Sequence, residues 1–187
     1  MNSLFKRLKK EHDIYAKERG VIITTSREIL MLSKKAIFSI HRNNPKDAAK
    51  NLADAEQLLT KLQKNVSQDE CLQYEGSYLA ALEEYVEAKT LFEYLRTGHI
   101  PIISHVSIPY DAYLSGLADV TGELLRQMVL QTTTGKTDNL KRYYKTAQEI
   151  TAALLEFDLT GKLRQKFDET KRNLKSMEQI LYDVSLR

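Results

Sequence analysis

Apolar residues recur every three to four positions along most of this chain, which is the spacing of one face of an α-helix. The clearest run extends from Ile22 to Ile40 and includes the apolar residues Ile29, Leu30, Leu32, Ala36 and Ile37. Strong helix breakers occur at only a few points, namely Gly20 and residues 43–45, 98–109, 132–135 and 160–161. The intervening stretches predict helices at about residues 3–42, 45–66, 67–95, 110–131, 138–157 and 159–186.

Both ends of the third predicted helix are marked by residues typical of helix termini. Ser67 is followed three residues later by Glu70, which is the spacing of a capping box, so we expect the helix to begin there. Gly98 is expected to end it, because glycine readily adopts the left-handed conformation that closes many helices.

The composition supports an all-α fold. The 187 residues include only 7 Gly and 3 Pro, too few for a β-sandwich with a turn about every ten residues. Hydrophobic residues make up 42% of the chain and charged residues 28%, and no low-complexity linker or internal repeat divides it. We therefore predict a single all-α domain over residues 1–187, a bundle of six to seven helices.

The sequence also bears on location. No stretch approaches about eighteen consecutive apolar residues, and the N-terminal residues lack the apolar core of a signal peptide. Cys71 is the only cysteine, so the chain cannot form an internal disulfide. These features lead us to expect a cytoplasmic protein with no membrane partner.

Charge is unevenly distributed along the chain. The net charge is only +3, but residues 1–44 carry ten Lys and Arg against four Asp and Glu, or +6, and the remainder carries −3. A basic N-terminal third is consistent with binding of a polyanion such as a nucleic acid. It is equally the composition of a solvated amphipathic helix, and charge alone does not separate the two.

Two acid pairs stand at helical spacing. Glu84 and Glu87 share one face of the third predicted helix, and Asp119 and Glu123 share one face of the fourth. Each acid face lies opposite the clearest apolar stripe of its helix, so the simplest interpretation is a solvated surface. If the two faces meet instead, their carboxylates would suit Mg²⁺ or Mn²⁺ and could support attack of water on a phosphodiester.

Other chemistry is less well supported. The four histidines have no metal-ligand spacing, and no phosphate-binding loop or nucleophile motif is present. Tyr143 and Tyr144 stand among Lys and Arg, a combination that could stack on a single strand but is also typical of an amphipathic surface.

Particular strings resemble the translin family. They are Glu84-Tyr-Val-Glu-Ala88, Tyr113-Leu-Ser-Gly-Leu-Ala-Asp-Val-Thr-Gly-Glu-Leu124, Leu181-Tyr-Asp-Val-Ser-Leu-Arg187 and the basic stretch from Ser26 to Arg42. The acid motifs are similar to those of the translin-associated factor X branch, whereas the C-terminal string is closer to translin itself. This mixture suggests a compact homologue that assembles with copies of itself.

The resemblance implies roles for particular residues. Glu84, Glu87 and Asp119 would be catalytic metal ligands for Mg²⁺, with Mn²⁺ as the alternative, and Glu123 would be a further ligand. Lys34 would neutralise charge on the phosphate. Weaker candidates for guiding the nucleic-acid backbone are Arg7, Lys10, Lys17, Arg19, Arg27 and Lys35.

Two hypotheses about function follow from the resemblance. In the first, the chain is a Mg²⁺-dependent endoribonuclease that cleaves single-stranded RNA inside a hollow homo-octamer. In the second, it is a non-catalytic oligomer that binds single-stranded RNA or DNA, with an unused acid cluster. Cleavage of RNA with Mg²⁺ but not with EDTA would separate them.

Overall fold

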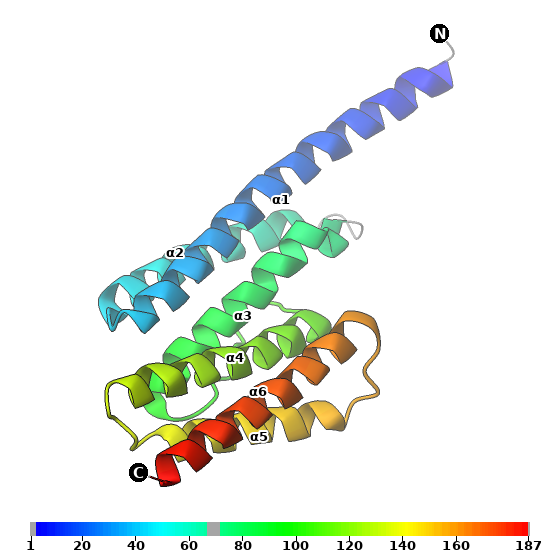
Figure 1. Cartoon of the computed structure of the whole chain (residues 1–187). Helices are drawn as coiled ribbons and strands as arrows, with labels where there is room; N and C mark the ends of the chain where they lie inside the picture. Colours follow the sequence, from blue (N-terminus) through cyan, green and yellow to red (C-terminus); the bar gives the residue numbers. More distant parts are fainter. Residues whose placement is uncertain (1–2, 67–71, 187) are drawn as a thin grey trace.

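The computed structural model describes residues 3–66 and 72–186, and these form six α-helices and one short 3-10 helix, with no strand (Figure 1). The helices are α1 (Ser3–His41), α2 (Pro45–Val66), η1 (Leu72–Tyr74), α3 (Gly76–Thr97), α4 (Tyr110–Thr133), α5 (Leu140–Leu155) and α6 (Gly161–Ser185). The predicted all-α bundle is confirmed. No helix in the described part is both long and apolar enough to cross a bilayer.

Helix α3 is the central element of the fold. It packs against α1 on one side and α4 on the other, so it joins the α1–α2 hairpin to the group formed by α4, α5 and α6 (Figure 1). Its burial explains this position, because Leu82, Tyr85, Val86 and Leu91 are all fully buried. A helix that is apolar on nearly every side must be covered on nearly every side.

Helix α1 changes character half-way along its length. From Ile22 onward, one face of the helix is buried against α2 and α3. The apolar residues Ile22, Ile29, Ala36 and Ile37 lie on this face, as the periodicity predicts, and Ser26 and Ser33 fill the turns between them. Residues 3–21 are exposed, and this half of the helix projects beyond the rest of the molecule (Figure 1). Gly20 does not interrupt the helix, which is continuous from Ser3 to His41.

The third helix begins later than predicted. Within the described residues, α3 starts at Gly76 and follows the short turn of η1, whereas Ser67 and Glu70 lie outside them. Leu72 is 1% exposed, so burying this side chain turns the chain before the helix begins. The predicted end is confirmed, because Gly98 is left-handed at φ 81° and its N–H donates to the Tyr94 carbonyl over 2.8 Å.

Candidate active site

Helices α3 and α4 approach each other closely at Gly116, one turn before Asp119. A Cβ atom at Gly116 would lie 2.6 Å from the backbone oxygen of Glu83 and 2.7 Å from the Cβ of Val86, so glycine is required there. Both contacts come from the turn of α3 that carries the predicted acids. The two acid pairs therefore lie near enough to interact electrostatically, and we call their four carboxylates the acid cluster: Glu84, Glu87, Asp119 and Glu123.

Glu87 is the most deeply placed member of the acid cluster. Its residue is 9% exposed, and its carboxyl group makes no hydrogen bond or ion pair within the described residues. Burial, followed by repulsion from Asp119, Glu84 and Glu123, raises the pKa of Glu87 from 4.5 to about 9. The expectation of solvated acids opposite the apolar stripe is therefore wrong for Glu87, because α3 is buried on that side as well.

Asp119 is held by a lysine from the last helix. The Lys166 ammonium donates to both carboxylate oxygens of Asp119, over 2.5 and 2.6 Å. Burial still raises the pKa of Asp119 above its ordinary value, although Lys166 acts in the opposite direction. One turn earlier, Lys162 makes a similar contact of 2.6 Å with Glu83 on α3. Through these two lysines, α6 is ion-paired to α4 and to α3 beside the acid cluster.

The outer acids have basic partners from α1. His41 is hydrogen-bonded to Glu123 through Nε2, and its Nδ1 lies 3.0 Å from the side-chain nitrogen of Gln127. The Lys34 ammonium lies 3.9 Å from the Glu84 carboxylate. A cavity of about 210 Å³, the acid pocket, is lined by these two acids and their basic partners together with three more residues: Lys34, His41, Glu84, Glu123, Ile37, Phe38 and Arg126.

The acid cluster suits a hard divalent cation in its donor chemistry. Its ligands would all be carboxylate oxygens, which Mg²⁺ and Mn²⁺ prefer, and the buried Glu87 carboxyl has no partner in the part of the chain that the structure describes. Across residues 3–66 and 72–186, however, no three His, Cys, Asp or Glu side chains stand close enough together to hold an ion. Basic side chains partner the other three carboxylates, so the ligand geometry is not preassembled.

The predicted nucleic-acid-binding residues all lie on α1 but do not share one site. Lys34 reaches the acid pocket, and Lys35 lines a neighbouring groove. Arg27 is exposed, and Arg19 donates to the Glu75 carboxylate over 2.7 Å. The remaining three lie on the exposed, projecting half of α1: Arg7, Lys10 and Lys17. Only two of the seven therefore line a described cavity beside the acid cluster.

The tyrosine pair does not form a stacking surface. Tyr143 is 2% exposed, and its hydroxyl accepts a hydrogen bond of 3.0 Å from Gln131. Tyr144 donates to the Glu178 carboxylate over 2.8 Å. The stacking alternative is therefore wrong for Tyr143, because the amphipathic helix turns this ring into the core.

Sequence reasoning missed three residues around the acid cluster. Lys166 and His41 each pair with a cluster acid, and Arg126 lines the acid pocket. Arg126 stands three residues after Glu123, a spacing that could have placed it on the acid face. The other two had no such signal, because their partners lie far away in the sequence.

A model of the translin family matches residues 17–187 of the chain. The chain belongs to the translin family. Among its relatives is the translin-associated protein X homolog of Schizosaccharomyces pombe. The two sequences are 27% identical over an alignment that covers 91% of this chain and 82% of the relative. The solved structure of apo-NeC3PO superposes with a TM-score of 0.87 at 23% identity, covering 97% of each chain. An AfC3PO complex with duplex RNA gives a TM-score of 0.89 at 22% identity, covering 97% of this chain and 96% of that one. The predicted family and fold are confirmed.

Proposed function

We propose that this chain is a metal-dependent endoribonuclease that cleaves single-stranded RNA inside a hollow homo-oligomer, with an octamer as the expected assembly. The observation that carries the proposal is the acid cluster itself. Four carboxylates gather between α3 and α4, and the buried Glu87 has no protein partner in the described residues. Grouped and buried carboxylates oppose folding, so the cluster is best explained by a ligand that needs them.

In the proposed site, Glu84, Glu87 and Asp119 hold Mg²⁺ or Mn²⁺, and Glu123 is a further ligand. Such an ion, when bound, lowers the pKa of water and stabilises negative charge on phosphoryl oxygens. Lys34 lies 3.9 Å from Glu84, within reach of a phosphate oxygen bound at the cluster. His41 keeps the Glu123 carboxylate in one orientation through its hydrogen bond, as outer partners of metal ligands commonly do.

Two kinds of evidence support RNA as the substrate. The AfC3PO structure, which shares this fold, holds duplex RNA. In this chain, residues 1–44 carry a net charge of +6, and α1 runs from the projecting end to the acid pocket. A basic helix that ends beside the acid cluster can guide a polyanion toward the cleavage site.

The second candidate is a non-catalytic oligomer that binds single-stranded RNA or DNA. One observation favours it: Lys34, Lys166 and His41 already partner three of the four acids, and no metal group is preassembled among the described residues. In this alternative the acids serve as internal ion pairs, and the basic α1 supplies the affinity.

Cleavage of labelled RNA with Mg²⁺ or with EDTA separates the two candidates. We expect wild type to cleave single-stranded RNA faster than duplex RNA, and only with the metal. Asp119→Asn should lower cleavage at least about a hundredfold, because losing even an outer partner of a metal ligand costs 10- to 100-fold. Binding in EDTA should persist.

A matched control is Asp111→Asn, which makes the same change at an exposed position on the same helix. Its oxygen accepts a 2.8 Å hydrogen bond from the Ala112 N–H, and asparagine keeps that acceptor. If Asp119→Asn cleaved RNA at the same rate as Asp111→Asn, the proposal that the chain is a nuclease would be contradicted. The same would follow if the wild type bound RNA without cleaving it.

A further inference from the structure

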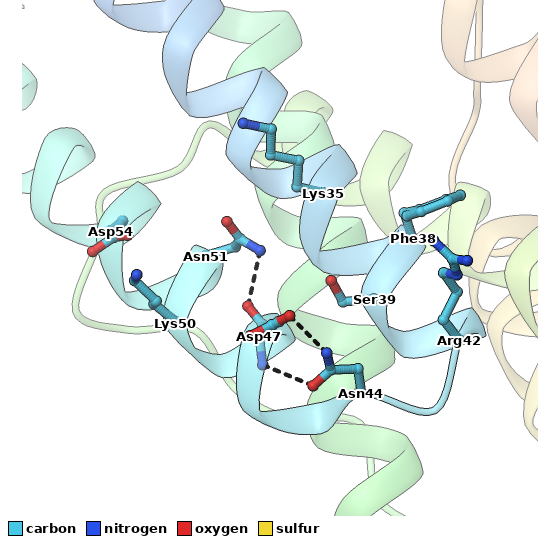
Figure 2. A pocket seen from close by; sticks show the side chains of 9 residues that line it. All are labelled: Lys35, Phe38, Ser39, Arg42, Asn44, Asp47, Lys50, Asn51 and Asp54. Carbon is cyan, nitrogen blue, oxygen red and sulfur yellow. Dashed lines mark hydrogen bonds between the residues drawn. The ribbon is translucent and has the colours of Figure 1, made fainter.

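A groove of about 620 Å³ lies where the end of α1 faces the start of α2 (Figure 2). Its charged lining consists of three cations, Lys35, Arg42 and Lys50, against two carboxylates, Asp47 and Asp54. The excess of positive charge favours an anionic ligand such as a phosphate group. We call this cavity the α1–α2 groove.

An aromatic side chain stands at the edge of the α1–α2 groove. Phe38 is 56% exposed, although exposing a large apolar side chain to water normally raises the free energy of the protein. The Arg42 guanidinium lies 5.1 Å from the centre of the Phe38 ring, one helical turn away, and Figure 2 shows the two side chains together. A cation packed on an exposed aromatic ring forms a surface on which a nucleobase can stack.

Phe38 also belongs to the acid pocket. It lines that pocket together with Lys34, Glu84 and Glu123, and it lines the α1–α2 groove together with Lys35. The ring therefore borders both cavities. A strand whose phosphate lies at the acid cluster would pass over this ring to reach the groove.

We propose that Phe38 is the stacking platform for the RNA base next to the phosphate at the acid cluster, and that Lys35 binds the following phosphate in the α1–α2 groove. The reaction in this assignment rests on the proposed function, whereas the stacking does not. Phe38 is thus a substrate-positioning residue that engages single-stranded RNA, because a base paired within a duplex is not free to stack on a side chain.

The groove offers little for reading base identity. The Asn44 amide donates to Asp47 over 2.6 Å, and the Asn51 amide donates to the Asp47 carbonyl over 2.8 Å. These amides are tied to the protein, which leaves stacking and charge as the means of recognition. Stacking tolerates every base, so we expect a weak sequence preference at this position.

The test uses full-length protein and single-stranded RNA that contains 2-aminopurine, measured first in EDTA so that no cleavage occurs. Stacking quenches the fluorescence of this base, so wild type should bind with quenching. Phe38→Leu should weaken binding by about 5- to 150-fold, the range for loss of one stacked base, and should abolish the quenching. Phe38→Trp should restore both, which a merely structural role for the ring would not predict.

Phe157→Leu is the matched control, because Phe157 is 49% exposed and lines neither cavity. Light scattering and circular dichroism should give every variant the wild-type mass and helical content. The proposal is overturned if Phe38→Leu binds and quenches like the control, or if Phe38→Trp fails to restore binding at unchanged mass. A lower mass for Phe38→Leu would overturn it as well, since Phe38 would then be a contact between copies of the chain.

The same variants separate this proposal from the proposed function. If wild type shows no cleavage with Mg²⁺ but Phe38→Leu still loses binding and quenching in EDTA, the nuclease fails and the stacking platform stands. If wild type cleaves and Phe38→Leu matches it in binding, quenching and cleavage, the nuclease stands and the platform fails.

Discussion

Glu87→Gln should stabilise the metal-free protein at neutral pH. Burial and the neighbouring acids raise the pKa of Glu87 from 4.5 to about 9, so the folded state keeps a proton that the unfolded state releases. Stability is therefore lost as the pH rises from about 4.5 toward about 9. At pH 7 the loss spans about 2.5 pH units at about 1.4 kcal/mol each, or roughly 3 kcal/mol. Glutamine has nearly the same shape and cannot ionise, so it avoids this loss.

Thermal unfolding followed by circular dichroism in EDTA measures the effect. A gain of about 3 kcal/mol corresponds to a rise in Tm of roughly 6–12 °C for a chain of this length. The gain in Tm of Glu87→Gln over wild type should be small near pH 5 and larger near pH 8.5, because position 87 can ionise only in the wild type. The exposed Glu28 supplies the control variant Glu28→Gln, which should leave Tm nearly unchanged. A Tm difference that is the same at every pH would refute the reasoning, as would a less stable Glu87→Gln at neutral pH.

Two further substitutions test how the acid cluster is held together. Gly116→Ala should lower the free energy of unfolding by about 1–3 kcal/mol, because the new methyl would lie 2.6 Å from the Glu83 backbone oxygen. Urea denaturation measures this change. A more stable variant would contradict the close approach of α3 and α4. Lys166→Met removes the cation bound to Asp119, so the pKa of Asp119 should rise further and the metal-free Tm should fall more steeply with pH than in wild type. Mg²⁺ should raise Tm more in this variant than in Lys162→Met, and equal responses would argue against a metal at the cluster.

Most of the fold could be predicted from the sequence. Scarce Gly and Pro excluded a β-rich fold, and the apolar residues from Ile22 to Ile40 predicted the buried face of α1. The start of α3 could not be predicted, because the apolar pattern continues through Leu72 and hides the turn before Gly76. Periodicity records which residues share a face, and it does not show where a buried side chain redirects the chain.

The candidate site was predicted less completely. Helical spacing paired Glu84 with Glu87, but the meeting of α3 with α4 depends on the missing side chain of Gly116, which is visible only when both helices are in place. Lys166 was missed for a similar reason, because α6 carries many Lys and Arg residues and nothing local distinguishes the one that reaches Asp119. Pairings between distant helices require the packed structure.

The central position of α3 has an evolutionary consequence. The same helix supplies the core residues Tyr85 and Val86 and the carboxyl of Glu87, which has no partner among the described residues. Under the proposed function, stability and chemistry therefore compete on one element. Selection for folding alone would replace Glu87 with a neutral residue, because the substitution removes a cost and opens no cavity. In a lineage of this fold that no longer needs the acid cluster, position 87 should be among the first to lose its charge. Under the proposed function, a retained glutamate there would mark selection for the metal site.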